Sequence, residues 1–330
     1  MALSGMIAAY KSSTTPQKSQ VFFTEALETL DRCKWLDSSV VYTDAKETDV
    51  SVGNKEKRTT ATEPLPSLQE AVSRARWRND LHCYIHVLTG LVAATHSRWP
   101  QVKESVDRIQ AVPASSPGSV IELLGLYLTG AYHQGTGDLE TAMSIFQDSR
   151  FEVGETRQRQ RSPGLDISLL AAMNVLWIME HPDYQDVAES SRIMERIRPL
   201  CQDHPDMQIR TAFNLIFATA TLQPKPTLQE VKQSMSTALN LSRVSGNTHC
   251  LAIALNIMRC KLFENVVGEQ ALKSAKAASS QAKKSGNMLW MSVADGMLAH
   301  SHDVQGQSEQ AVAAHKTATA YASKALTGDS

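Results

Sequence analysis

Apolar residues recur along most of the chain with the three- and four-residue spacing of amphipathic helices, and the pattern indicates helix throughout. It predicts helices near 17–34, 67–78, 80–96, 100–111, 118–134, 138–148, 166–180, 184–202, 206–221, 227–244, 248–264, 268–284, 287–303 and 307–325. The segment SLLAAMNVLWIME, at 168–180, is apolar almost all round. Such a helix is expected to be packed between neighbouring helices, and Trp177 within it and Trp290 are expected in the core.

Two polar stretches interrupt the helical pattern. Residues 43–66 are rich in Thr, Lys and Glu without any period, which is typical of a mobile insertion loop. Residues 152–164 include RQRQRSPG and predict a second exposed loop. The domain organisation that follows is an N-terminal helix plus mobile loop over 1–66, and a helical repeat array over 67–330.

A period of forty residues runs through the array. Three triplets recur forty residues later: LTG of 88–90 at 128–130, SGN of 245–247 at 285–287, and EQA of 269–271 at 309–311. PLPSLQE and PKPTLQE lie four such periods apart, and each contains a capping box, Ser67 with Glu70 and Thr227 with Glu230. Self-similarity at a period of this size is the signature of a helical repeat protein.

The glycine-rich stretch GAYHQGTG, at 130–137, could be a phosphate-binding loop or a turn between two helices. A phosphate-binding loop continues with lysine and a hydroxyl residue, whereas Thr136 follows Gly135 here. The preceding IELLGLYLTG also has helical rather than strand character. The helix turn is therefore favoured, with Gly135 and Gly137 ending the helix and permitting a positive φ.

Small and large residues recur at the spacing of a tetratricopeptide helix pair. That motif places a small residue where two helices cross, a second small residue twelve positions later and a large residue four positions after that. Gly130, Ala142 and Phe146 match it, and Gly90, Val102 and Val106 keep the same spacing with Trp99 in the aromatic turn position. Ala271 and Ala311 are the small residues of two further second helices.

The predicted fold is all-α, a tetratricopeptide-like right-handed superhelix of antiparallel helix pairs with a concave groove. In such pairs the first helix lines the concave face. The repeat register then makes these residues candidates for a partner-binding groove: Tyr84, Tyr127, Gln134, Asn256, Cys260, His300 and Asp303. This mixed polar and aromatic set suits an extended peptide, because the peptide's backbone needs hydrogen-bond partners and its apolar side chains need aromatic contact.

Composition narrows the functional class. A net charge of −1 gives no general attraction to nucleic acid or to anionic membranes, and no apolar run is long enough to span a bilayer. The five cysteines, Cys33, Cys83, Cys201, Cys250 and Cys260, are widely spaced, which suits reduced thiols in a cytosolic or nuclear protein.

Candidate catalytic and metal chemistry is sparse. His82 and His86 lie four residues apart on a predicted helix, a spacing compatible with zinc, but no acidic general base lies between them. The basic runs RARWR at 74–78 and RQRQR at 157–161 favour solvated surface over direct DNA contact. No nucleophile elbow or dinucleotide fingerprint is present, so neither enzymatic activity nor a metal or cofactor is expected.

Three segments resemble the fungal branch of the cohesin loading factor family, the tetratricopeptide subunit of the cohesin loader: YLTGAYHQGTGDLETAMSIFQDSRF, LLAAMNVLWIMEHP, and VVGEQALKSAKAASSQAKKSGNMLWMSVADGMLAHSHDVQGQSEQA. The resemblance covers roughly 80–325. It implies a nuclear, chromatin-associated scaffold that grips the extended N-terminal segment of a large HEAT-repeat partner, the Nipped-B type adherin. Together the two subunits place cohesin on chromosomes for sister-chromatid cohesion, so the contact with cohesin itself would be indirect.

Members of this family are generally much longer, and the chain resembles their C-terminal half or a shortened member. The resemblance therefore implies that N-terminal repeats which complete the superhelix are absent. Repeat spacing by itself is equally compatible with a tetratricopeptide adaptor that binds peptides of another partner.

Overall fold

The computed structural model describes residues 16–32, 68–111, 119–153, 163–262 and 268–327. All regular secondary structure within these residues is helical, and the polar loop predicted over 43–66 lies outside them. The first described helix, α2 (Pro16–Arg32), packs against the first helix of the repeat array through Phe23, Leu30 and Ile85.

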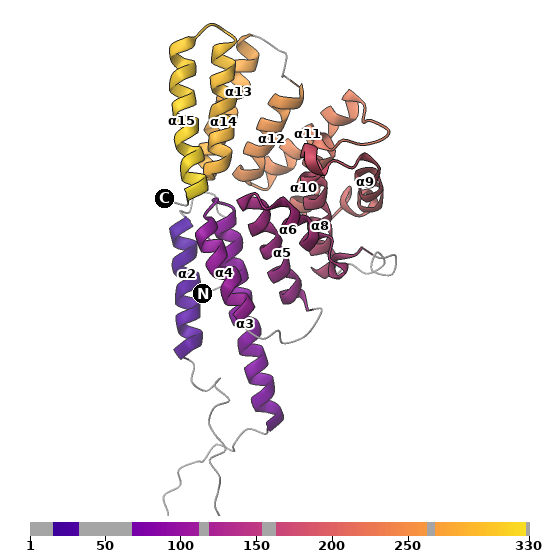
Figure 1. The fold of residues 1–330 in the computed structure, drawn as a ribbon, viewed down its shortest axis with the longest axis vertical. Helices are drawn as coiled ribbons and strands as arrows, with labels where there is room; N and C mark the ends of the chain where they lie inside the picture. Colours follow the sequence, from indigo (N-terminus) through magenta and orange to yellow (C-terminus); the bar gives the residue numbers. More distant parts are fainter. Residues whose placement is uncertain (1–15, 33–67, 112–118, 154–162, 263–267, 328–330) are drawn as a thin grey trace, which may run out of the picture.

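The array consists of helix pairs joined by short turns (Figure 1). The six pairs within the described residues are α3 (Leu68–Ala94) with α4 (Trp99–Ala111), α5 (Val120–Thr136) with α6 (Leu139–Phe146), α8 (Pro163–Ile178) with α9 (Val187–Cys201), α10 (Met207–Thr219) with α11 (Leu228–Val244), α12 (Thr248–Leu262) with α13 (Glu269–Ser285), and α14 (Met288–Asp303) with α15 (Ser308–Thr327). Two short 3₁₀ helices, η2 (Ser149–Phe151) and η3 (Pro182–Tyr184), flank α8.

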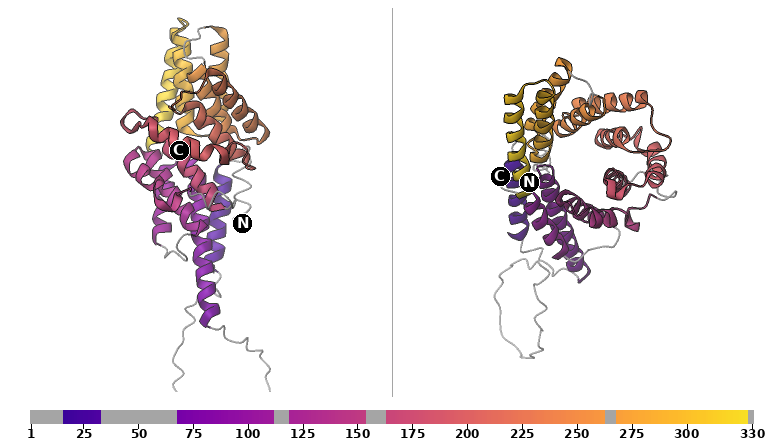
Figure 2. Two further views of the ribbon diagram at one scale, coloured as in Figure 1. Left: turned by 90° about the vertical axis from the view of Figure 1, so that its right-hand side faces the viewer. Right: turned by 45° about the horizontal axis from the view of Figure 1, so that its top comes forward.

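The first helices of successive pairs contact one another in the order α3, α5, α8, α10, α12 and α14. These helices form a continuous inner wall, and the second helices pack against them. Figure 2 shows the consequence in its right-hand view, where the pairs curve through a full turn and α14 returns to the side of α3 and α4. The predicted all-α, tetratricopeptide-like superhelix of helix pairs is confirmed.

The forty-residue period corresponds to one helix pair. Each SGN triplet forms the turn that precedes a first helix, in which Gly246 and Gly286 adopt left-handed φ angles of 68° and 69°. The asparagine side chain then caps the helix, because Asn247 Oδ1 accepts from Cys250 N at 2.9 Å and Asn287 Oδ1 accepts from Trp290 N at 2.9 Å. The repeated residues therefore encode one recurring turn.

Glycines on the first helices allow unusually close packing. A Cβ atom added at Gly130 would lie 2.7 Å from Cε1 of Phe146, and one added at Gly90 would lie 2.5 Å from Cδ2 of Leu128. The small partners on second helices are buried as well, with exposed fractions of 0% for Val102 and Ala142, 2% for Ala271 and 8% for Ala311.

Gly135 differs from the sequence interpretation. It was expected to end a helix, but α5 continues through Thr136, and Gly137 alone takes the left-handed conformation, with φ 88°. At Gly135 a Cβ atom would collide with the indole ring of Trp99. The glycine therefore accommodates the aromatic residue of the preceding pair.

Several predicted helix boundaries change. The expected break between 67–78 and 80–96 is wrong, because α3 runs unbroken from Leu68 to Ala94. No glycine or proline lies near the expected break, and Arg78 beside it lies 3.6 Å from Asp31 of α2. The expected loop at 152–164 is shorter than predicted: Val153 is buried and α8 already starts at Pro163.

The capping box of Thr227 and Glu230 is confirmed, whereas Ser67 lies outside the described residues.

Two glycine substitutions test the role of close helix packing. We expect Gly130→Ala to destabilise the protein by about 1–3 kcal/mol, because the ring of Phe146 is buried and cannot yield easily. Gly296, also inside a first helix, has nothing within 4 Å of an added Cβ. Gly296→Ala is therefore expected to stabilise by roughly 0.5–1 kcal/mol through helix propensity. Chemical denaturation measures both, and equal effects of the same sign would contradict the packing argument.

Candidate functional site

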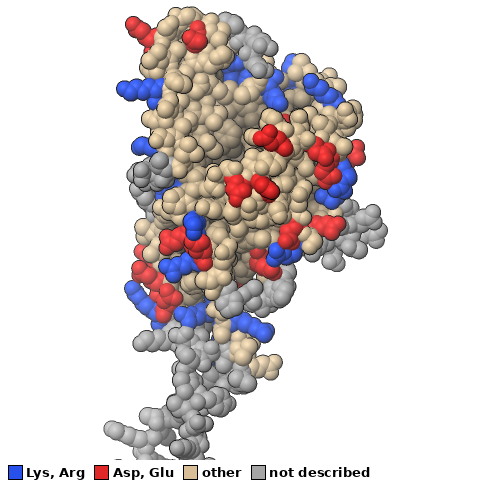
Figure 3. All heavy atoms as spheres, in the orientation of Figure 1, with Lys and Arg blue, Asp and Glu red and all other residues tan. Residues whose placement is uncertain are grey.

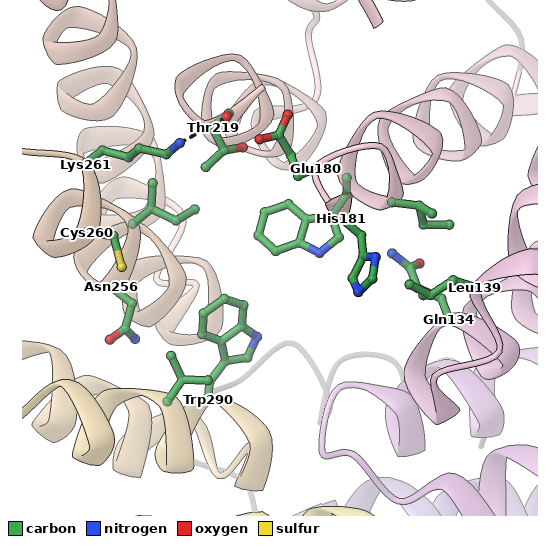
Figure 4. A pocket seen from close by; sticks show the side chains of 13 residues that line it. Gln134, Leu139, Glu180, His181, Thr219, Asn256, Cys260, Lys261 and Trp290 are labelled. Carbon is green, nitrogen blue, oxygen red and sulfur yellow. Dashed lines mark hydrogen bonds between the residues drawn. The ribbon is translucent and has the colours of Figure 1, made fainter. Parts of the chain in front are cut away.

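A cavity of about 540 Å³ lies on the inner surface of the superhelix. We refer to it as the central cavity. Its lining comes from α5, α6, α8, α10, α12 and α14 and from the turn after α8, so five of the six pairs contribute. Figure 4 shows the labelled side chains around one open space, with Trp290 on one side and Gln134 and Leu139 on another. Residues far apart in sequence thus share one site because the inner wall curves.

Much of the central cavity wall is apolar. The apolar lining residues are Leu139, Trp177, Ile178, Ile257, Trp290 and Val293. Trp177 is 36% exposed although its neighbours Leu176 and Ile178 are almost fully buried. The expectation that Trp177 and Trp290 belong to the core is therefore wrong: α8 is buried on nearly all sides, but the side that carries Trp177 faces the cavity.

Polar groups at the rim are fixed by hydrogen bonds to the end of α10 and the residues that follow it. The Glu180 carboxylate accepts from Thr221 N at 2.6 Å and from Thr221 Oγ1 at 3.2 Å. Lys261 Nζ donates to Thr219 O at 3.3 Å from the opposite wall. These two side chains place a negative and a positive charge close to the same chain segment, so the rim has no dominant sign.

Three of the seven predicted groove residues reach the central cavity: Gln134, Asn256 and Cys260. Asn256 is only 2% exposed, and its Nδ2 donates to Ala252 O at 2.9 Å, so its amide is held against its own helix. Cys260 is exposed and its Sγ lies 3.9 Å from Sδ of Met297.

The other four predicted groove residues are not brought to the central cavity. Tyr127 is packed against the large core cluster, where its hydroxyl accepts from Asn174 Nδ2 at 3.0 Å and its ring lies 5.6 Å from that of Phe146. Burial also raises the pKa of Tyr127. Tyr84 lies on α3, outside the cavity lining, and His300 and Asp303 are exposed in the last turns of α14.

Sequence reasoning missed Trp177, Glu180, Lys261 and Trp290 as cavity residues. In a helix that is apolar almost all round, no periodic signal separates the one cavity-facing indole from its buried neighbours. Glu180 and Lys261 could have been found from their position at the end of a first helix, because a charged residue there follows a buried apolar run. Which of these residues contact a partner stays a prediction.

One contact closes the turn of the superhelix. Asn287 is 4% exposed, and its Nδ2 donates to Thr95 O at 2.7 Å across 192 residues of sequence. Ser97, which has a positive φ of 59°, donates from Oγ to Asn287 Oδ1 at 3.3 Å. We call this contact of 95–97 with Gly286 and Asn287 the seam. It joins the first and last helix pairs of the turn whose inner surface carries the central cavity.

Two histidines lie at the seam. A Cβ added at Gly286 would lie 3.5 Å from Nδ1 of His96, so this imidazole packs directly on the turn before α14. Burial is the largest cause that lowers the pKa of His96, followed by the Arg98 charge. Burial also lowers the pKa of His249 to about 4, and a charge on His96 lowers it further. Both imidazoles are thus held in the neutral form, and their protonation would place like charges beside the closing contact.

The described residues contain no group of three or more His, Cys, Asp or Glu side chains placed to hold a metal ion. The imidazoles of His82 and His86 pack edge to face with centroids 4.6 Å apart, and burial lowers the pKa of His86 to about 4. Cys83, Cys201 and Cys250 are free thiols, and Cys33 lies outside the described residues. Burial raises the pKa of Cys201 to about 12 and that of Cys250 to about 11.

Charged side chains of both signs are interspersed on the molecular surface. Figure 3 shows that the area over α14 and α15 carries few of them, whereas basic and acidic groups alternate near α2 to α4. The basic run at 74–78 lies on the first turns of α3, where Trp77 is 54% exposed, and the second run at 157–161 lies outside the described residues. None of the described helices combines the length and apolar character required to cross a bilayer.

Comparison with known proteins identifies one family. A family model described as cohesin loading factor matches residues 1–309. No curated protein and no solved structure matches the chain.

Substitutions at Asn287 test the seam. We expect Asn287→Ala to cost about 1–3 kcal/mol, because it removes both a helix cap and a buried hydrogen bond. Asn287→Ser retains a capping oxygen but cannot bridge to Thr95, so it should recover only part of this loss. Hydrogen exchange at 95–97 is expected to accelerate in Asn287→Ser and not in Asp186→Ser, which alters the side-chain cap of the second helix α9, away from the seam. Unchanged exchange at 95–97 would show that the seam contact is not formed.

The seam histidines predict acid lability. Their folded-state pKa values lie below the unfolded value of 6.5, so stability is full above about pH 6.5 and declines as the pH falls towards 4. The shift at His249 alone corresponds to about 3 kcal/mol of unfolding free energy lost by pH 4. His249→Gln should reduce this pH dependence and leave the part that comes from the other buried histidines, among them His86, whereas the same change at the exposed His315 should leave it unaltered. Denaturation curves between pH 7 and pH 4 measure it, and a wild-type stability independent of pH would refute the assignment.

Proposed function

Because the chain belongs to the cohesin loading factor family, and thereby has a role in cohesin loading, we propose that it is the non-catalytic scaffold subunit of the loading complex. Its partner is the large HEAT-repeat subunit, the Nipped-B type adherin, whose extended N-terminal segment occupies the central cavity. The complex acts on chromatin in the nucleus, where it promotes cohesin loading and sister-chromatid cohesion, and the chain reaches cohesin only through the adherin.

The observation that carries this proposal is the central cavity itself. It lies on the inner wall of a turn that the seam closes, and side chains of six helices line it. Five of the six helix pairs contribute to its wall, so an extended segment that runs along the inner surface can contact all five. Recognition of an extended segment is therefore the activity that the geometry favours.

The chemistry of the wall supports the same conclusion. Apolar side chains offer contacts for the side chains of a peptide, and Gln134, Glu180 and Lys261 offer donors and acceptors to its backbone. No pair of carboxylates or nucleophile with a base is arranged there among the described residues, so binding rather than turnover is the chemistry that the site supports.

A tetratricopeptide adaptor for a different partner is the alternative. The same cavity would serve any extended segment with suitable side chains. Binding of the adherin N-terminal segment, compared with a scrambled segment of equal composition, separates the two functions. Failure of the adherin segment to bind, with affinity purification recovering another protein instead, would favour the alternative.

Polar cavity residues provide the test of where the segment binds. Tyr127 and Asn256 were predicted from sequence for this purpose, but both are tied into the core and their substitution would also affect folding. We expect Gln134→Ala combined with Lys261→Ala to weaken binding about 30-fold, since each loses one net hydrogen bond of about 1 kcal/mol. Isothermal titration calorimetry with the adherin N-terminal segment measures the affinity.

The matched control combines Lys232→Ala with Gln233→Ala on α11, a second helix whose two side chains are exposed and lie outside the cavity. This control should bind like the wild type. Equal affinity of the cavity variant and the control, with both folded by circular dichroism, would mean that the segment runs along another surface.

A further inference from the structure

Trp177 and Trp290 are the two large aromatic side chains of the central cavity, and they come from non-adjacent first helices. Trp177 lies in the last turn of α8 and Trp290 in the first turn of α14. Trp177 is exposed to the cavity although burying an indole is strongly favourable. Exposed aromatic side chains in a concave site are typical of surfaces that a partner covers.

The indole N–H groups are also available. Neither Trp177 Nε1 nor Trp290 Nε1 donates a hydrogen bond to another described residue. Figure 4 shows the indole nitrogen of Trp290 on the side that faces the open space. An indole nitrogen is a donor only, so its natural complement is a carbonyl oxygen, such as those along a peptide backbone.

The surroundings favour a neutral side chain between the two indoles. Ile178, Ile257 and Val293 complete an apolar wall around them. The nearest carboxylate, Glu180, already accepts two hydrogen bonds from Thr221, and Lys261 is held at Thr219. With one charge of each sign fixed at the rim, the cavity offers no uncompensated partner to a cationic or anionic side chain.

We propose that Trp177 and Trp290 form an anchor subsite that takes one bulky apolar side chain, of the size of leucine, methionine or phenylalanine, from an extended peptide, and that their indole N–H groups donate to carbonyl oxygens of its backbone. The proposal rests on the proposed function, because the occupant is the extended segment held in the central cavity. It goes beyond that function by naming the side-chain class that is recognised and the two residues that select it.

The proteins used in the test are the full chain and four variants: Trp177→Ala, Trp290→Ala, Trp177→Phe and Trp290→Phe. Trp77→Ala is the matched control, because Trp77 is 54% exposed and lies outside the cavity. The probe is a synthetic peptide of the adherin N-terminal segment, together with a series in which each bulky apolar residue is replaced by alanine. Thermal melting identifies variants that remain folded.

Each alanine variant should bind the peptide about 10- to 100-fold more weakly, which is the range of an interface hot spot. The phenylalanine variants should lose less, because they keep an aromatic contact and lack only the N–H donor. One peptide position should show coupling: its change to alanine weakens binding about tenfold to the wild type and less than about twofold to the folded alanine variants.

Four outcomes distinguish failure of the proposed function from failure of the anchor subsite. If the wild type does not bind the peptide, the proposed function and the subsite both fail. If the wild type binds and both alanine variants bind within about twofold of Trp77→Ala, the subsite alone is overturned. Coupling to an acidic or basic peptide position instead of an apolar one would overturn the assigned side-chain class. If an alanine variant does not fold, the phenylalanine variants are used instead. Wild-type affinity in both Trp177→Phe and Trp290→Phe would overturn the proposed N–H contacts.

Discussion

The packing of the first two helix pairs depends on close approach between helices at glycines, which have no side chain at the point of contact. Gly90 admits Leu128 of the next pair, Gly130 admits the ring of Phe146, and Gly135 admits the indole of Trp99. Because interiors are packed to near crystalline density, each contact fixes the distance between two helices within narrow limits. The spacing of the first two helix pairs follows from these contacts.

Much of this architecture could be predicted because it is encoded locally. The SGN turns specify a left-handed glycine followed by a capping asparagine, and this combination repeats at Asn247 and Asn287 with the period of one helix pair. One helix boundary failed where neither glycine nor proline is near, and others failed at Gly135 and Pro163, which lie inside helices. Asn79 looked like a break although neither glycine nor proline is near it, and α3 continues through it.

The central cavity was predicted less well, for a physical reason. The set of residues that lines it depends on the path of the superhelix, which brings α5, α8, α12 and α14 to one space. The repeat pattern of the sequence does not specify that path. Gln134 and Cys260 were found because their repeat register fixes the face on which they lie. Tyr127 was misplaced because the same register cannot distinguish a side chain that points into the cavity from one that turns towards Asn174 in the next pair.

Closure at the seam has a topological consequence for assembly. A terminal segment can be threaded end first through a closed turn, whereas an internal segment between two folded domains can enter only after the turn has opened. Opening there would break the bonds from Asn287 to Thr95 and from Ser97 to Asn287. An occupant that entered by this route would be retained kinetically after reclosure, because its release would require either the same opening or the withdrawal of its whole length.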